Sequence, residues 1–292
     1  MKESKADGIA AYYDNLSRFL DLAHRVGRGG GASQGATHRF LAGTTGEKNL
    51  ENAAPERLDR LILEAAIAAG LPAEPRVLDA GCGLGGTIFR WRERVGGFYD
   101  GLTLSPQQVH RAEAEAVRRG VAECCHFHLR SYHAPVSGSY NAVIAIESLA
   151  HSADPTAAIA NLATALVPCG LLLIVDDMPD ANAEGGMLAA FKTHWRCPVL
   201  ADAASYRAAI VAAGLKPLRE EDLTNRLRPR PLYWLKVLIA VFGLARRVAP
   251  TRGLRDVFDA MIGGFLLEAL YRMGGMHYRL IVALKPAADN TL

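Results

Sequence analysis

The stretch Val77-Leu78-Asp79-Ala80-Gly81-Cys82-Gly83-Leu84-Gly85-Gly86 decides the fold of this chain. An apolar run leads into a glycine-rich turn, and the following Thr87-Ile88-Phe89-Arg90-Trp91 has the character of a helix. Glycines in such a turn let backbone N–H groups approach a ligand closely. Gly81, Gly83 and Gly86 also satisfy the pattern G-x-G-x-x-G, so a dinucleotide-binding fold is the first hypothesis.

Asp79, two residues before the first glycine, argues against a dinucleotide. Its carboxylate would repel a pyrophosphate, but it suits a ligand that carries an ammonium and a sulfonium group. The segment VLDAGCG resembles motif I of the class I S-adenosylmethionine (SAM)-dependent methyltransferases. The resemblance implies that SAM is the cofactor and that the loop binds its amino-acid end through Asp79, Gly81, Cys82 and Gly83.

Composition indicates an ordinary soluble protein. The chain has 292 residues, of which 50% are hydrophobic and 22% charged, and this is enough for one large or two small domains. A formal charge of +3 is too small to indicate a nucleic-acid partner. Five cysteines without framework spacing predict reduced thiols and a cytoplasmic location, and the polar N-terminus lacks the apolar core of a signal peptide.

Apolar runs that alternate with helical segments predict a parallel, doubly wound sheet. After the strand at the glycine loop, strands are predicted at 98–104, 124–129, 141–146, 171–175 and 216–223. The resemblance implies that the run 278–286 is a closing antiparallel strand. The expected fold is therefore α/β: a Rossmann-like, doubly wound, seven-stranded sheet with N-terminal lid helices and a helical cap inserted before the last strand.

The resemblance divides the chain into three parts. Residues 1–70 form an N-terminal helical lid, residues 71–223 and 277–287 the SAM-binding core, and residues 224–276 a helical substrate cap. In the lid, Tyr13 is expected to contact the cofactor and Tyr12 the acceptor, although the helical pattern around them also fits an ordinary packing helix. His38 begins a segment where relatives often carry His-Phe-Gly-Tyr-Trp, which implies a contact with the acceptor.

The segment Gly101-Leu102-Thr103-Leu104-Ser105-Pro106-Gln107-Gln108 narrows the resemblance. It is similar to the branch that contains cyclopropane-fatty-acid synthases, sterol and tocopherol methyltransferases, and natural-product methyltransferases. In that branch the Thr-Leu pair and the following glutamine contact the nucleoside, which implies Thr103, Leu104 and Gln108. Tyr132 would stack on the adenine, with Ser131 at its edge, and Asp100 is interpreted as a solvated strand start.

The segment Glu147-Ser148-Leu149-Ala150-His151 resembles forms found in sugar-, sterol- and terpenoid-modifying methyltransferases. Glu147 is expected to contact the methionine end of SAM or the acceptor. His151 is the predicted general base, because imidazole accepts a proton near neutral pH; a structural histidine that caps the helix after Asp154 is the alternative. Asp176 aligns with an acid that assists deprotonation of the acceptor in related O-methyltransferases.

The sequence predicts no metal site. Asp176 and Asp177 are adjacent carboxylates without a third ligand. His126, His128 and His133 lack a cysteine or carboxylate at zinc spacing.

The region between 224 and 276 supports more than one interpretation. Arg226, Arg228 and Arg230 are either solvated loop charges or ligands for an anionic head such as a prenyl diphosphate. Tyr233 and Trp234 begin an aromatic-rich apolar segment that is too short to span a bilayer. This segment is interpreted as core packing, as a cap that contacts the acceptor, or as a membrane-surface contact.

These features favour C-methylation of a small lipophilic isoprenoid or terpenoid in secondary metabolism. O- or N-methylation of a polyketide, glycoside or quinone is the alternative within methyltransferases. A SAM-binding protein without transferase activity and a nicotinamide-dependent dehydrogenase are alternatives from other classes. The expected partner is a small-molecule acceptor and not a nucleic acid, with a weak membrane-surface contact and a homodimer as further expectations.

Overall fold

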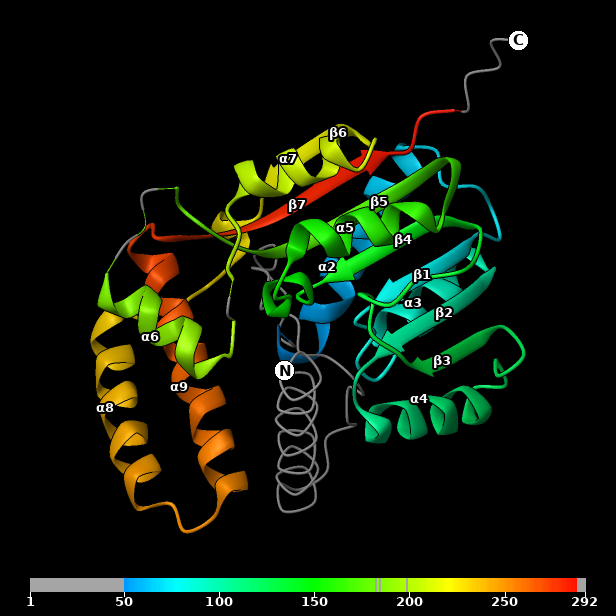
Figure 1. The fold of residues 1–292 in the computed structure, drawn as a ribbon. Coiled ribbons are helices and arrows are strands. Elements are labelled where there is room, and N and C mark those ends of the chain that lie inside the picture. Colours follow the sequence, from blue (N-terminus) through cyan, green and yellow to red (C-terminus); the bar gives the residue numbers. More distant parts are fainter. Residues whose placement is uncertain (1–49, 182, 184, 198, 288–292) are drawn as a thin grey trace.

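The computed structural model describes residues 50–181, 183, 185–197 and 199–287, with the backbone alone over 50–56 (Figure 1). Tyr12, Tyr13 and His38 lie outside the described residues, so the roles expected of them in a lid stay predictions.

The described strands form one seven-stranded sheet in the order β3-β2-β1-β4-β5-β7-β6. The first five strands pair in parallel, and β7 runs antiparallel to both of its neighbours, β5 and β6. This confirms the predicted α/β, doubly wound sheet and its closing antiparallel strand. The strands are β1 (Arg76–Ala80), β2 (Phe98–Thr103), β3 (Cys125–Leu129), β4 (Tyr140–Ile146), β5 (Leu166–Pro179), β6 (Lys216–Asp222) and β7 (Met276–Leu284).

Helices cover both faces of this sheet (Figure 1). One face carries α2 (Leu50–Ala68), α3 (Gly86–Val95) and α4 (Pro106–Arg118), and the other carries α5 (Pro155–Thr164) and α7 (Ala203–Ala212). Successive strand residues therefore enter two different cores: Val77 and Ile144 enter one, whereas Leu78 and Val143 enter the other. Because both faces are buried, the central strands are almost continuously apolar in sequence.

Side-chain caps fix where the helices begin. Ser105 accepts a hydrogen bond from Gln108 N at 3.1 Å, and Asp154 accepts one from Ala157 N at 2.9 Å. Each cap is followed by a proline in the first helical turn, which suits that position because its missing N–H has no partner there. The two caps therefore fix where the loops after β2 and β4 end, at the carboxyl edge of the sheet. Strand order reverses between β1 and β4, and ligands of doubly wound sheets bind at such a point.

Three further helices form a cap beside the end of β5 and the start of β7 (Figure 1): α6 (Gly186–His194), α8 (Leu232–Val248) and α9 (Arg252–Arg272). Helix α9 contacts both α6 and α8. Trp195, at the end of α6, donates to Ala260 O at 3.0 Å, and Gly263 permits this approach because a Cβ there would overlap the indole. None of the described helices has the combination of length and apolarity that crossing a bilayer requires.

Candidate active site

The glycine loop after β1 is closed by backbone hydrogen bonds. Gly81 N and Cys82 N both donate to Leu102 O, at 3.0 and 2.9 Å, which binds the loop to β2. Gly81 has φ +113°, a region that residues with a side chain rarely adopt. A Cβ at this position would also overlap Ser148 Cβ and lie 3.1 Å from its hydroxyl. The loop therefore requires glycine at 81 for two independent reasons.

The hydroxyl of Ser148 supports a ligand at this loop. Its Oγ is buried and has no hydrogen-bond partner within the described part of the chain. A buried polar atom left in that state costs about 1–3 kcal/mol. Ser148 lies directly against Gly81, in the loop predicted to hold the amino-acid end of SAM. A loop with close backbone approach and an adjacent unpaired hydroxyl fits a small polar cofactor.

Cys82 acts through its backbone and its packing. Its side chain is buried against Gly101, where an added Cβ would lie 2.7 Å from the sulfur. Burial, and then the nearby carboxylate of Asp79, raise the pKa of the Cys82 thiol well above its usual range. The sulfur is thus a neutral packing group under the loop, and a contact with the cofactor would come from the backbone.

The segment after β2 is preorganised by its own side chains. The Thr103 hydroxyl donates to Gln108 Oε1 at 2.6 Å and accepts from Ser105 N at 3.2 Å. This contact uses the Gln108 carbonyl and leaves its amide N–H groups as donors. Leu104 is half-buried between these polar residues. The structure thus brings Thr103, Leu104 and Gln108 together beside the glycine loop, and their contact with a nucleoside stays a prediction.

Asp100 is a structural residue, but it is not solvated as expected. Its carboxylate accepts from Tyr140 Oη at 3.0 Å and contacts His128 Nε2 at 2.9 Å. Its side chain is 13% exposed, and its backbone pairs with both β1 and β3 two residues after β2 begins. The resulting network joins three strands at a distance from the loop.

Tyr132 links the loop after β3 to the end of β4. Its hydroxyl donates to Ser148 O at 3.0 Å, and burial raises its pKa above the usual tyrosine value. Ser131 Oγ accepts from His133 N at 3.1 Å and closes the turn. The ring of Tyr132 is held 5.1 Å from that of His133. Both residues predicted near the adenine therefore have a structural role of their own.

Glu147 stands in a strained conformation at the end of β4. Its φ of +51° is unusual for a residue with a side chain. Tyr278, on β7, donates its hydroxyl to Glu147 Oε1 at 2.8 Å. On the same face of the sheet, the hydroxyl of Tyr271 from α9 donates to Asp177. Backbone strain that the surroundings maintain often marks a functional position, and here two tyrosines support the acidic edge.

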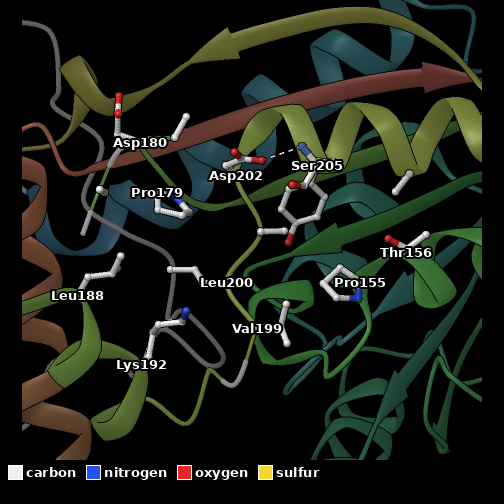
Figure 2. A pocket seen from close by; sticks show the side chains of 15 residues that line it. Pro155, Thr156, Pro179, Asp180, Leu188, Lys192, Val199, Leu200, Asp202 and Ser205 are labelled. Atoms are coloured by element: carbon white, nitrogen blue, oxygen red, sulfur yellow. Dashed lines mark hydrogen bonds between the residues drawn. The ribbon is translucent and has the colours of Figure 1, made fainter. Parts of the chain in front are cut away.

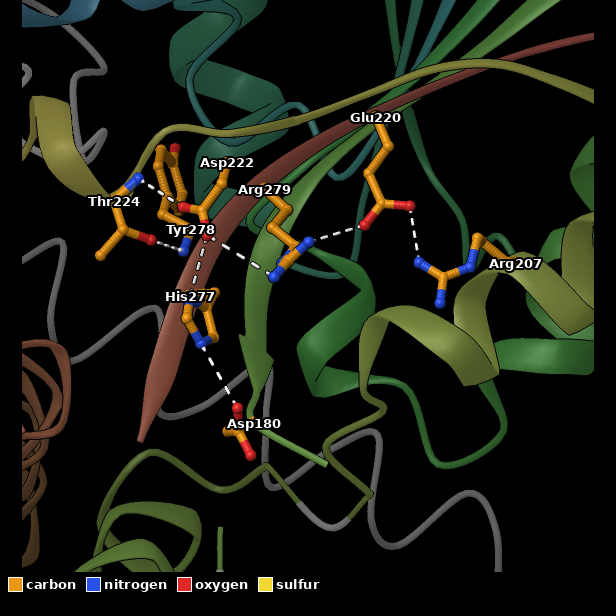
Figure 3. A network of polar contacts seen from close by, with 8 residues as sticks. All are labelled: Asp180, Arg207, Glu220, Asp222, Thr224, His277, Tyr278 and Arg279. Carbon is orange, nitrogen blue, oxygen red and sulfur yellow. Dashed lines mark hydrogen bonds and ion pairs between the residues drawn. The ribbon is translucent and has the colours of Figure 1, made fainter. Parts of the chain in front are cut away.

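The start of β7 is fixed by a polar network that places Tyr278 (Figure 3). His277 Nδ1 contacts Asp222 Oδ2 at 2.9 Å, and its Nε2 lies 3.7 Å from Asp180. Tyr278 N donates to Thr224 Oγ1 at 2.9 Å. These contacts tie β7 to the end of β5 and to the turn after β6. Tyr278 is a residue that sequence reasoning missed; its place in the last strand gives no local sign of a contact with Glu147.

His151 ends a short 3₁₀ helix, η1 (Leu149–His151), and faces the loop after α6. Its Nδ1 lies 3.8 Å from the sulfur of Cys197, which is fully buried. The thiol of Cys197 lies 3.6 Å from Trp195 O, and the indole of Trp195 is centred 6.5 Å from the imidazole. The predicted base is therefore held by a thiol and an aromatic ring. It does not form the side-chain cap of α5, which Asp154 provides.

Asp176 faces the opposite side of β5 from Asp177. Its carboxylate accepts from Ala150 N at 2.8 Å and from Asp177 N at 2.9 Å, and it lies 3.4 Å from Tyr206 Oη. Burial, followed by the charge of Asp177, raises the pKa of Asp176 to about 8. The two acids cannot share a metal ion, because their side chains point into different cores. Asp176 supports the segment that carries His151, and Asp177 is the acid that faces the cap.

The raised pKa of Asp176 predicts a specific loss of stability with pH. The folded pKa of about 8 exceeds the unfolded value of about 3.9, so folding takes up a proton. The stabilisation is complete below about pH 4, and it is lost as the pH rises through about 8. Within this window the free energy of unfolding should fall by up to about 1.4 kcal/mol per pH unit.

Urea denaturation at several pH values within this window measures the slope. Asp176→Asn carries no titratable proton and should show a smaller slope than the unmodified protein, whatever its absolute stability. Equal slopes in the two proteins would mean that Asp176 titrates normally.

The predicted acceptor ligands of the cap are spread over its surface. Arg226 pairs with Glu221 at 2.6 Å, and Arg230 forms a forked contact with Glu268 while lying over the ring of Phe265. Arg228 is exposed. Tyr233 and Trp234 are also exposed and contact each other edge to face, with ring centroids 5.4 Å apart. None of these five residues lines the cavity described next, and their contact with an acceptor stays a prediction.

A cavity of about 430 Å³ opens between α5, α6, α7 and the end of β5 (Figure 2). Leu188 and Lys192 of α6 line one side, and Tyr206 of α7 separates the cavity from Asp176. The described lining includes none of the residues predicted to bind cofactor or acceptor. Sequence reasoning missed this cavity because α6, which forms part of its wall, was not predicted.

Comparison with known proteins agrees with the loop geometry. A family model described as a methyltransferase domain matches residues 78–172. The O-methyltransferase cnsE of Penicillium expansum is 29% identical over 177 residues, which are 59% of this chain and 63% of that protein. A geranyl diphosphate 2-C-methyltransferase of Saccharopolyspora erythraea is 48% identical over 59 residues, which are 20% of this chain and 21% of that protein. The chain thus matches less than two thirds of the length of either relative.

A solved structure of geranyl diphosphate methyltransferase in complex with GPP and sinefungin aligns with a TM-score of 0.71. The alignment covers 97% of this chain and 99% of that one at 18% identity, a level that shows a shared fold. The residues matched by the family model contain the glycine loop, the Thr103–Gln108 turn and the Glu147–His151 segment. Residues 78–172 match a methyltransferase domain, and together these comparisons support a class I SAM-dependent methyltransferase with SAM as its cofactor.

Proposed function

We propose that this protein transfers the methyl group of SAM to a carbon atom of a small isoprenoid, such as a prenyl diphosphate. The observation that carries the proposal is the aromatic surroundings of the Glu147–His151 segment. Trp195 lies beside the His151 imidazole and Tyr278 beside the Glu147 carboxylate, while Phe191 packs on Trp195 and Tyr271 donates to Asp177 on the same face of the sheet. Methylation of an alkene leaves a carbocation, which aromatic faces and a carboxylate stabilise until a proton departs.

SAM supplies the methyl group when it is bound. The glycine loop and Ser148 would hold its amino-acid end, and the Thr103–Gln108 turn would hold its nucleoside. The protein's main contribution is to keep the acceptor in line with the methyl group and to exclude water. Glu147 is restrained by Tyr278, so its carboxylate is already oriented before an acceptor arrives.

Cys197 sets the tautomer of His151 in this mechanism. The Cys197 thiol is directed to Trp195 O, which leaves its sulfur as an acceptor for Nδ1–H of His151. The lone pair then lies on Nε2, and this nitrogen can take the proton. The same imidazole can deprotonate a hydroxyl, so O-methylation of a polyketide or quinone is the second candidate, and the name of the Penicillium relative supports it.

Labelled SAM incubated with a panel of acceptors tests the proposal. The panel contains a prenyl diphosphate, the corresponding prenol, a phenolic polyketide and a quinol, and product NMR locates the new methyl group. We expect label on a carbon of the prenyl diphosphate. Label on oxygen would select the second candidate. Thermal protection by SAM without turnover of any acceptor would favour a SAM-binding protein without transferase activity, and protection by NAD instead would contradict the family assignment.

If the acceptor is a diphosphate, Arg228 is the arginine expected to bind it. All three arginines are exposed, but Arg226 and Arg230 pair with Glu221 and Glu268, whereas Arg228 forms no ion pair within the described part of the chain. Loss of a charge-assisted hydrogen bond of about 1.5–3 kcal/mol corresponds to an increase in KM of roughly 10- to 150-fold for Arg228→Ala. Arg226→Ala is the matched control and should change KM little. Equal KM values for all three proteins would exclude this segment as the diphosphate site.

A further inference from the structure

Helix α8 lies at the outer edge of the cap (Figure 1), and it carries a stripe of exposed apolar side chains. Its large side chains are highly exposed: Tyr233 69%, Trp234 55%, Val241 56%, Leu244 64% and Val248 76%. At 100° per residue, these five positions fall within one sector about 100° wide. We call them the α8 outer stripe. Isolated exposed apolar residues are common, but a continuous stripe on one helix indicates a binding surface.

Packing among the described residues does not explain the stripe, because α8 attaches to them through a second apolar face. Leu235 is fully buried on this inner face. Phe242 packs edge to face on Phe258 and Phe265 of α9, with ring centroids 5.9 and 5.3 Å apart. The inner face thus provides the attachment to α9. The packing of the described residues therefore does not use the outer stripe.

The charge on α8 identifies the kind of partner. The helix sequence LYWLKVLIAVFGLARRV contains no acidic residue and three basic ones. Arg246 pairs with Asp259 of α9 at 2.5 Å. Lys236 and Arg247 are exposed on the side of the helix next to the outer stripe. An apolar sector bordered by cations, with tyrosine and tryptophan at one end, is the pattern of helices that lie in the plane of an anionic membrane surface.

We propose that the α8 outer stripe docks on the surface of an anionic lipid bilayer. The helix would lie along the interface, with the stripe among the acyl chains and Lys236 and Arg247 near the headgroups. A second copy of this chain fits the surface less well. In a two-fold contact between α8 helices, the same cationic border would face itself without an acid from α8 to neutralise it. Docking would bring the cap to the phase in which lipophilic molecules concentrate.

Co-sedimentation of the whole protein with lipid vesicles tests the proposal without any acceptor or methyl transfer. The protein should bind to vesicles of phosphatidylcholine mixed with phosphatidylglycerol. Its affinity for vesicles of pure phosphatidylcholine should be at least about tenfold lower, because each basic residue near an anionic surface contributes about 1 kcal/mol to the binding free energy. Brominated lipid should quench Trp234 but not the buried Trp91. Binding that is equal on both kinds of vesicle, or absent from both, would overturn the proposal.

The triple variant Val241→Ser, Leu244→Ser, Val248→Ser distinguishes vesicle binding through the outer stripe from nonspecific binding through exposed apolar residues elsewhere. It should lose vesicle binding, whereas the control Val117→Ser, Val211→Ser, which removes two exposed valines from α4 and α7, should retain it. Retained SAM binding shows that both variants fold. Undiminished vesicle binding by the triple variant would refute the role of the stripe. A dimer in size-exclusion chromatography that the triple variant abolishes, with no vesicle binding, would assign the surface to a second copy instead.

Discussion

Replacement of His151 with alanine is expected to lower the rate of methyl transfer by about 100- to 10,000-fold, the range over which a positioned acid or base contributes. SAM binding should be unchanged, because the imidazole contacts Cys197 and the ring of Trp195 rather than the glycine loop. Single-turnover kinetics measures the first effect, and isothermal titration with SAM measures the second. Retained turnover would transfer the role of base to Glu147.

Variants of Cys197 provide the matched control for this prediction. Cys197→Ser keeps an acceptor for Nδ1–H and should leave the pH–rate profile nearly unchanged. Cys197→Ala removes that acceptor, so the profile should shift and the rate should fall while SAM still binds. A purely packing role for Cys197 would instead make the two variants alike in pH profile.

Replacement of Gly81 with alanine is expected to abolish measurable SAM binding. The new Cβ would overlap Ser148 Cβ, and alanine at φ +113° would be strained even in open space. The loop would have to move away from the end of β4, which would break the hydrogen bonds from Gly81 N and Cys82 N to Leu102 O. Titration calorimetry with SAM measures the loss, and circular dichroism checks that the fold is intact.

Two comparisons separate the overlap from backbone strain. Gly70 has a similar φ of +102°, but no atom lies within 4 Å of the position that an added Cβ would take. Gly70→Ala therefore introduces backbone strain without an overlap, and this variant should bind SAM normally. Adding Ser148→Gly to Gly81→Ala removes the overlap and should restore part of the binding. If the double variant binds no better than Gly81→Ala alone, the position of Ser148 is not what requires glycine at 81.

The sequence predicts the core of the fold because its signals are local. The apolar runs that form β1 and β4 end at the carboxyl edge of the sheet, and Ser105 and Asp154 mark the helices that follow. The glycine loop is equally readable, since only glycine satisfies the conformation at 81. Each of these features depends on neighbours within a few positions in the chain.

Features that depend on distant contacts could not be predicted in this way. Asp176 and Asp177 lie on β5, a strand that is buried on both faces. Polar and apolar residues do not alternate along such a strand, so the sequence does not show which of the two acids faces the cap. Helix α6 is only nine residues long, and it is recognised by its packing on α9 rather than by the periodicity of its apolar residues. The partner of His151 comes from Cys197, which lies 46 positions later and has no motif around it.

The position of β7 has a consequence for how the molecule is assembled during synthesis. This strand is the last in the described sheet, yet it lies between β5 and β6, and its Tyr278 reaches Glu147 across 131 positions. During synthesis the glycine loop therefore leaves the ribosome long before β7, the strand whose Tyr278 contacts Glu147. Until β7 arrives, β5 presents an unpaired, apolar edge, which is a template for aggregation. The yield of active protein from a cell should then depend on how quickly the final segment follows, and slowing translation ahead of Met276 should cost solubility before it costs cofactor binding.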